Sequence, residues 1–172
     1  MKNKPNNYAF IDSQNVHKGI KHLGWDIDWY RFLVYLKEKY KVSAIYLFIG
    51  FVQENQKLYE YLQKCGYILI FKPIIFDGEG KVKGNCDADL VLHTLLKINE
   101  YEKAVIVTSD GDFYSLVRHL YEQKKLEMVL SSYVKTCSKL LKKEAKEKIN
   151  YMDNLRNKIG RNENAPHKDG TL

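Results

Sequence analysis

The sequence predicts an α/β protein whose parallel β-sheet of about five strands is flanked by helices on both faces. Two observations support this class. Short apolar runs, several of them rich in β-branched residues, recur along the chain, and most are followed by a segment with apolar residues every three or four positions. Strands that alternate with helices in this way are typical of a parallel sheet with right-handed crossovers.

The first half of the chain contains three strand candidates. Asp12 ends the first of them, and the segment Ser13-Gln14-Asn15 can cap a following helix. The expected elements, in order, are a strand over 8–11, a helix over 29–40 that Asp28 caps, a strand over 44–50, a helix over 58–65 that Gly66 ends, and a strand over 67–71.

The second half continues the alternation. The expected elements are a loop or irregular hairpin over 76–84, a helix that opens at 85–87 and carries Leu92, Leu95, Leu96 and Asn99, a strand over 104–107, a helix from Phe113, a strand over 126–130, and helices over 134–141 and 142–159. We expect residues 1–159 to form one domain with a substantial core. Residues 160–172 are polar, with Pro166 and Gly170, and are predicted to be a flexible tail.

Charge and composition narrow the class of protein. The formal net charge is +7, which favours an anionic partner, most often nucleic acid, with solubility alone as the other explanation. The three cysteines are far apart, which argues against a zinc site and a disulfide framework and favours reduced thiols in a cytoplasmic protein. No apolar run is long enough to span a membrane, and no signal-peptide pattern is present.

A short acidic turn follows the strand predicted over 104–107. It contains Asp110 and Asp112, separated by Gly111, and leads into the helix that begins near Phe113. The turn therefore lies at the carboxyl end of a strand, where open α/β sheets bind their ligands.

Three further carboxylates are expected near this turn. Asp12 ends the first strand, and Asp87 and Asp89 open the helix that leads into the strand over 104–107. If these segments are neighbours in the sheet, four or five carboxylates meet at one edge.

Clustered carboxylates raise each other's pKa or require a cation. A set of oxygen ligands without His or Cys suits Mg²⁺ or Mn²⁺, and such ions support phosphodiester chemistry. Polar and basic residues expected near this edge are candidates for contacts with substrate phosphates: Lys18, Lys72, Lys83, Ser109 and Arg118.

Each acid also has a purely structural interpretation. Asp12 can be a strand-end cap, Asp87 and Asp110 can be helix N-caps, and Asp112 can be a first-turn charge. Asp89 can pair with His93 one turn further along a helix. Taken singly, these interpretations are the more common ones; the convergence of three acidic segments on one edge favours a site.

Three segments of the sequence resemble a known family. They are Tyr8-Ala9-Phe10-Ile11-Asp12-Ser13-Gln14-Asn15, Lys83-Gly84-Asn85-Cys86-Asp87-Ala88-Asp89-Leu90 and Thr108-Ser109-Asp110-Gly111-Asp112-Phe113. In order and spacing, from about Tyr8 to Leu130, they resemble the NYN domains, in the LabA-like branch of the PIN-like nucleases. The Ser-Asp-Gly-Asp-Phe turn is the most specific of the three.

The resemblance implies a Rossmann-like PIN fold and a divalent-metal nuclease that usually acts on RNA. It implies that the family's acidic positions fall on Asp12, Asp87, Asp110 and Asp112 and its nearby amide on Asn15, with Asp89 where relatives often carry an acid. Two positions depart from the family pattern: Ser13 replaces a common Gly, and Cys86 replaces a usual Val. Neither departure removes a carboxylate.

The leading hypothesis is a metal-dependent endoribonuclease in which Asp12, Asp87, Asp110 and Asp112 hold Mg²⁺ or Mn²⁺. Asn15 would orient Asp12 or a phosphate oxygen, and similar enzymes leave a 5′-phosphate and a 3′-hydroxyl. The main alternative is an RNA-binding or regulatory module without turnover. The preference for RNA over DNA comes from the resemblance alone, and single-stranded or structured RNA, and a monomer or a homodimer, all stay open.

Two other metal-dependent phosphotransfer classes fit less well. A haloacid-dehalogenase-like phosphatase needs Asp-x-Asp after the first strand, but Gln14 stands at the second acidic position. A Toprim-like domain needs Glu at the end of the first strand, where this chain has Asp12.

Overall fold

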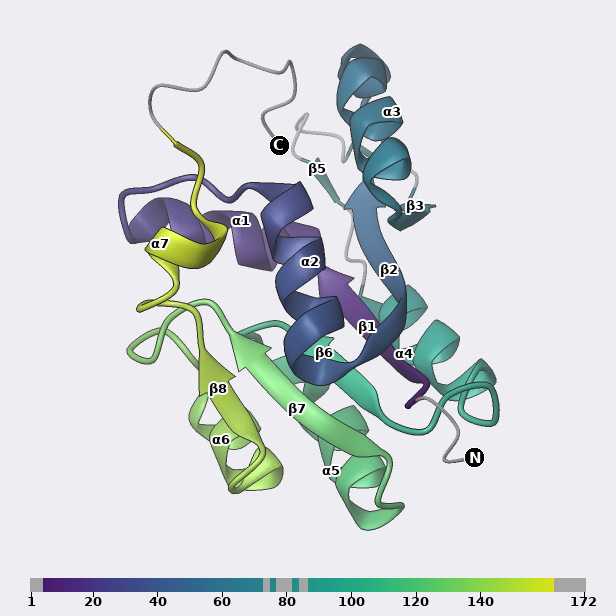
Figure 1. Cartoon of the computed structure of the whole chain (residues 1–172). Helices are drawn as coiled ribbons and strands as arrows, with labels where there is room; N and C mark the ends of the chain where they lie inside the picture. The colour runs from purple at the N-terminus through teal and green to yellow at the C-terminus, as the bar shows by residue number, and fades with distance from the viewer. Residues whose placement is uncertain (1–4, 73–74, 77–81, 84–86, 163–172) are drawn as a thin grey trace.

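The core of the protein is a parallel sheet of six strands in the order β3-β2-β1-β6-β7-β8 (Figure 1). The computed structural model describes residues 5–72, 75–76, 82–83 and 87–162. The strands of the sheet are β1 (Asn7–Asp12), β2 (Val42–Gly50), β3 (Ile68–Lys72), β6 (Ala104–Val107), β7 (Leu126–Ser131) and β8 (Ile149–Tyr151). The expected α/β class with a parallel sheet is confirmed, with one strand more than expected.

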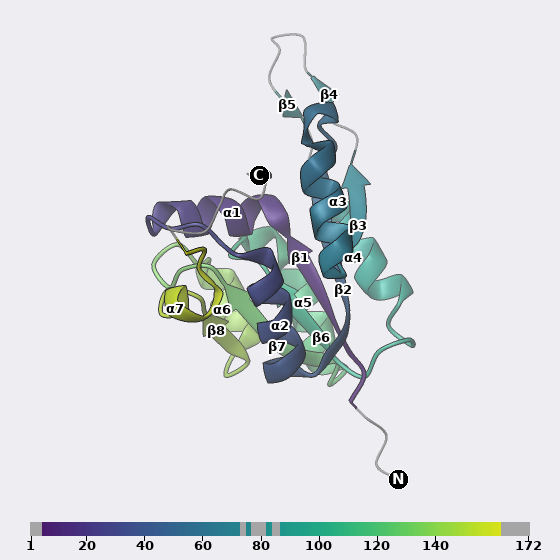
Figure 2. The same ribbon diagram turned by 45° about the horizontal axis from the view of Figure 1, so that its top comes forward.

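Helices cover both faces of this sheet (Figures 1 and 2). One face carries α1 (Ser13–His22), α2 (Trp29–Tyr40), α3 (Gln56–Cys65) and the short α7 (Arg156–Ile159), and the other carries α4 (Asp87–Leu96), α5 (Tyr114–Glu122) and α6 (Lys139–Ala145). Phe10 and Ile11 are both fully buried, one in each of the two hydrophobic clusters. Burial on both faces explains why the central strand reads as a continuous apolar run.

The order of the strands creates a switch point between β1 and β6. The chain runs from β1 to β2 and β3 on one side and then crosses to β6, β7 and β8 on the other. Since β1 and β6 pair in parallel, with Ile11 opposite Val107, the residues that follow both strands meet at one place. Open α/β sheets bind ligands at such a point, outside the carboxyl ends of the strands.

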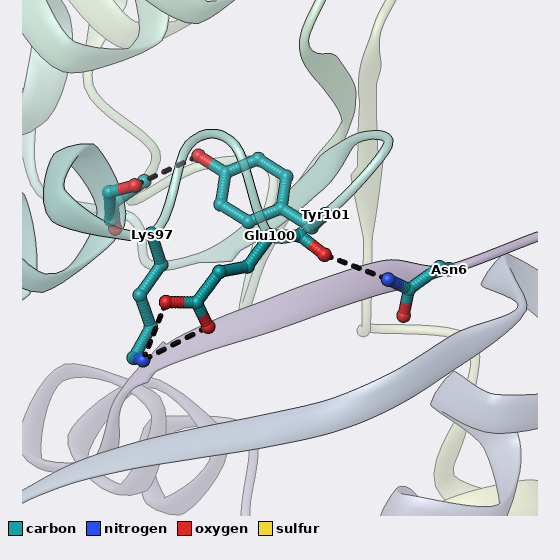
Figure 3. A network of polar contacts seen from close by, with 5 residues as sticks. Asn6, Lys97, Glu100 and Tyr101 are labelled. Carbon is teal, nitrogen blue, oxygen red and sulfur yellow. Dashed lines mark hydrogen bonds and ion pairs between the residues drawn. The ribbon is translucent and has the colours of Figure 1, made fainter.

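Polar contacts stabilise the segments that precede the amino ends of β1 and β6 (Figure 3). Asn6 Nδ2 donates to the carbonyl oxygen of Glu100 at 2.7 Å, and the Glu100 carboxylate pairs with Lys97 at 3.1 Å. Tyr101 donates its hydroxyl to the carbonyl oxygen of Thr94 at 2.9 Å. The Asn6 bond joins the segment after α4 to the residue before β1, and the other two contacts hold that segment against the end of α4.

The C-terminal helices expected over 134–141 and 142–159 are wrong in extent. The chain turns after β7, α6 begins only at Lys139, and it ends at Ala145, where Lys146 has a φ of 52°. The segment Ile149–Tyr151 then forms β8 beside β7. Its β-branched and aromatic residues suit an edge strand, and pairing with β7 outweighs the helical pattern of the flanking charges.

The packed part of the chain continues beyond the expected boundary at residue 159. Gly160 is buried and bridges to Ile27, and Arg161 N donates to the carbonyl oxygen of Asp26 at 2.8 Å. The Arg31 guanidinium also donates to the carbonyl oxygen of Gly160 at 2.8 Å. The rest of the expected tail, from residue 163, lies outside the described residues.

Two features lie beside β3 and α4. The strands β4 (Ile75–Phe76) and β5 (Val82–Lys83) pair antiparallel, in agreement with the hairpin alternative for 76–84, whose centre lies outside the described residues. The leucines that mark α4 in the sequence are exposed, with Leu92 at 53% and Leu96 at 71%, whereas Leu90 and Thr94 face the core.

No helix in the described part of the chain is long and apolar enough to cross a bilayer.

Candidate metal centre

Asp12 is the last residue of β1 and the N-cap of α1. Its Oδ1 accepts a hydrogen bond from the backbone N–H of Asn15 at 3.1 Å, and its Oδ2 accepts one from Thr108 Oγ1 at 3.4 Å. The residue is only 7% exposed. The structural interpretation of Asp12 as a cap is therefore correct, and the cap holds its carboxylate at the switch point.

Ser13 explains one departure from the family pattern. Its side chain is buried, and its Oγ donates to the carbonyl oxygen of Phe48 at 2.7 Å. The hydroxyl fastens the first residue of α1 to the carboxyl end of β2. Cys86, the other departure, lies outside the described residues.

Asn15 joins the ends of the two central strands. Its Oδ1 accepts from the backbone N–H of Ser109, the second residue after β6, at 2.8 Å. Ser109 is buried, and its Oγ bonds Ser131 Oγ at 2.8 Å and accepts from Ser132 N at 3.1 Å. Asn15 thus positions the acidic turn, and the Ser109 side chain is engaged inside the protein.

The acidic turn itself is held by its own hydrogen bonds. Asp110 caps the short 3₁₀ helix η2 (Gly111–Phe113), because its Oδ1 accepts from Asp112 N at 3.0 Å. Asp110 N in turn donates to Thr108 Oγ1 at 3.2 Å, and Phe113 is fully buried. Thr108 therefore contacts both Asp12 and Asp110.

Gly111 has a steric reason to lack a side chain. A Cβ at this position would lie 2.5 Å from Ser138 Oγ and 3.1 Å from Ser138 Cβ. Ser138 cannot easily yield, since its Oγ accepts from Leu140 N at 3.2 Å and caps α6. Glycine lets the acidic turn pack directly against the start of α6.

Three of the predicted acids gather in one group. Asp87, Asp110 and Asp112 each offer a carboxylate oxygen such that the three oxygens lie within 4.8 Å of one another. Asp87 and Asp110 are half-buried, and Asp112 is exposed. Residues far apart in the sequence therefore meet, as expected from the order of the strands.

Asp12 stands outside this group of three but is electrostatically coupled to it. Burial is the largest cause that raises the pKa of the Asp12 carboxyl, to about 6, and the negative charges of Asp87 and Asp110 raise it further. The hydrogen bonds from Asn15 N and Thr108 act in the opposite direction. The neighbouring negative charges thus disfavour ionisation of Asp12 in the absence of a cation.

The donor set fits a hard divalent cation. The group offers carboxylate oxygens, which Mg²⁺ and Mn²⁺ prefer, and the exposed Asp112 leaves it accessible to solvent. Within the described part of the chain, no Lys or Arg forms an ion pair with Asp12, Asp110 or Asp112. A bound cation would offset the mutual repulsion of these carboxylates.

The other predicted site residues lie at varying distances from this group. Asp89 follows Asp87 by two residues on α4, which turns the two side chains to different sides of the helix, and it is absent from the group of three. Lys18 is exposed on α1, and Lys72 ends β3 at the same edge of the sheet. Arg118 pairs with Glu144 on α6 at 3.1 Å. The Lys83 side chain lies outside the described residues.

Two residues of the site gave no clear functional signal in the sequence. Thr108 and Ser138 carry no charge, and Ser138 is 28 positions from Asp110 along the chain. The one available signal for Thr108 was its place as the first polar residue after an apolar strand. Ser138 became relevant only through its contact with Gly111.

A solved structure supports the fold. A protein of unknown function from Vibrio parahaemolyticus superposes with a TM-score of 0.78 at 20% sequence identity, over 94% of this chain and 99% of that chain. At this identity the similarity concerns the fold alone. No curated protein matches the chain.

The sequence also matches the NYN domain family over residues 8–153. The match includes all four acids described above and every strand of the sheet except the first residue of β1. The chain therefore belongs to the NYN domain family.

Proposed function

We propose that this protein is a metal-dependent endoribonuclease of the LabA-like branch, which hydrolyses RNA phosphodiester bonds with Mg²⁺ or Mn²⁺. One observation carries the proposal: Asp12, Asp87, Asp110 and Asp112, from three distant segments, converge at the switch point of a parallel sheet. Membership of the NYN family supports a nuclease of the PIN-like type.

The carboxylates of Asp87, Asp110 and Asp112 would hold the ion. Asp12 would add Oδ2 as a further ligand or as an acceptor, because its bond from Thr108 Oγ1, at 3.4 Å, is longer than the bond of 3.1 Å that Oδ1 accepts from Asn15 N. Asp89 is a further, less favoured candidate for a metal ligand. A bound Mg²⁺ or Mn²⁺ would supply the Lewis acidity that activates water and offsets charge on a phosphodiester.

Asn15 and Thr108 act as positioning residues. Asn15 uses its carbonyl oxygen to hold Ser109, so its Nδ2 is the atom available to meet a phosphate oxygen. Thr108 sets the spacing between Asp12 and Asp110 through its single hydroxyl. Cleavage leaves a 5′-phosphate and a 3′-hydroxyl.

The substrate class follows from charge and family. A net charge of +7 favours a polyanion, and the NYN family favours RNA. Lys18 and Lys72, on the carboxyl side of the sheet, are candidates for phosphate contacts. We propose that the protein acts in the cytoplasm.

A second function, RNA binding without turnover, is favoured by one feature. Asp12 and Asp110 both cap helices, so the fold has a use for these two acids even without a metal. Calorimetry with Mn²⁺ separates the two functions. A pure binder releases no heat that depends on the carboxylates, whereas the nuclease does.

The proposal is tested with 5′-labelled RNA and DNA panels, with Mn²⁺ or with EDTA. Asp110→Asn keeps the cap of η2 but removes a charge, so it should fold normally and lose roughly 100-fold or more of the cleavage rate. Asp26→Asn is the matched control, because Asp26 is an exposed carboxylate beyond α1 that pairs with Lys21 at 3.6 Å. Undiminished Mn²⁺-dependent cleavage by Asp110→Asn refutes the assignment.

A further inference from the structure

The acidic turn packs directly against the start of α6. Ser138 N donates to the carbonyl oxygen of Ser109 at 3.1 Å, and Ser138 also packs against Gly111 between the two acids. The next residue, Lys139, is the first of α6 and is exposed. A cationic side chain therefore begins one residue beyond a direct contact with the acidic turn.

Most basic side chains around α5 and α6 are already engaged. Arg118 pairs with Glu144, Lys142 Nζ donates to the carbonyl oxygen of Val134, Lys146 Nζ lies 4.3 Å from the centre of the Tyr121 ring, and Lys148 Nζ donates to the carbonyl oxygen of Leu126. These contacts hold the charges against the protein surface.

Lys139 and Lys143 differ from these neighbours. Both are exposed, and among the residues that the structure describes neither side chain has a hydrogen bond, an ion pair or a ring contact. Their spacing of four residues places them on the same side of α6, about one turn apart. They form a short cationic strip that runs away from the acidic turn.

We propose that Lys139 and Lys143 bind the sugar–phosphate backbone of the RNA strand where it leaves the acidic cluster. The proposal rests on the proposed function in that RNA is the ligand. The acids repel phosphates, so a polyanion is held beside them only where cations border the cluster. Lysines without an internal partner can make these contacts without first breaking other bonds.

The test measures RNA binding in EDTA, so that cleavage does not intervene. A fluorescein-labelled single-stranded RNA oligonucleotide is titrated with the full chain at about 50 to 200 mM KCl. The double variant Lys139→Ala/Lys143→Ala is compared with Lys37→Ala/Lys64→Ala. The control removes the same charge from exposed positions near the ends of α2 and α3, on the amino side of the sheet.

The strip variant should bind roughly ten-fold more weakly at the lowest salt, and its log–log salt slope should fall by about 1.4, because each phosphate contact contributes about 0.7 for a single strand. The control should keep both the affinity and the slope of the wild type.

Equal losses of RNA affinity in both variants mean that only net charge matters, and they overturn the proposal. An unchanged affinity in the strip variant also overturns it, as does a wild type that binds no RNA. A wild type that binds through the strip but does not cleave with Mn²⁺ refutes the nuclease and leaves this inference standing.

Discussion

The side chain of Asn15 accepts a hydrogen bond from the backbone N–H of Ser109 at 2.8 Å. Asn15 belongs to the first turn of α1, and Ser109 directly precedes the acidic turn after β6. This bond links the acid at the end of β1 to the acids that follow β6. It is the shortest of the bonds that join the two central strands at the candidate site.

Removal of this link should weaken both the fold and the binding of the metal ion. In Asn15→Ala the N–H of Ser109 loses its acceptor, which should cost about 1 to 3 kcal/mol of unfolding free energy. Mn²⁺ affinity should fall roughly 10- to 100-fold, as for other residues that orient ligands. Calorimetry with Mn²⁺ and urea unfolding measure the two effects.

Gln14→Ala is the control, since Gln14 is the exposed neighbour of Asn15 on α1. The assigned role of Asn15 is wrong if its variant binds Mn²⁺ as tightly as the control does.

Asp12 should make the stability of the metal-free protein depend on pH. Its folded pKa of about 6 lies above the ordinary value of 3.8, so the buried carboxyl favours its protonated form. The stability that the protonated Asp12 carboxyl contributes to the folded protein is fully present below about pH 3.8. It is lost as the pH rises through about 6, where Asp12 ionises in the folded state. The shift corresponds to about 3 kcal/mol at neutral pH.

Asp12→Asn stays neutral at every pH and keeps an oxygen that accepts from Asn15 N. In EDTA it should be more stable than the wild type at pH 7.5, by up to about 3 kcal/mol, and equal to it near pH 3.8. Urea unfolding at several pH values measures the difference. A variant that is less stable than the wild type at pH 7.5 contradicts this account.

Glycine should be required at position 111 because a side chain there would collide with Ser138, and not because the backbone needs a conformation that favours glycine. Gly111→Ala places a Cβ against Ser138 Oγ and should cost about 1 to 3 kcal/mol of unfolding free energy. In a Ser138→Gly background the same substitution should cost less, since the atoms that it meets are gone. Thermal unfolding of the wild type, both single variants and the double variant forms a complete cycle. An equal cost of Gly111→Ala in both backgrounds excludes the steric explanation.

The sequence by itself determined the elements that depend on neighbouring residues. Asp28 as a cap and Gly66 as a helix end were predictable, because a cap bonds groups within a few positions and a φ of 110° suits glycine. The acids at Asp12 and Asp110 were predictable for the same reason, since each lies within three residues of the end of a short apolar run. These signals are local and need no knowledge of the packing.

Only the tertiary structure decided which segments meet. Ile149–Tyr151 is a strand because the edge of β7 is there to pair with it, and no local pattern reports that edge. The exposure of Leu92 and Leu96 depends on the angle at which α4 packs over β1. The order of the strands decides that Asp87 groups with Asp110 and Asp112 and that Asp12 lies outside this group but is coupled to it electrostatically. Contacts between distant segments are fixed by packing and not by sequence neighbours.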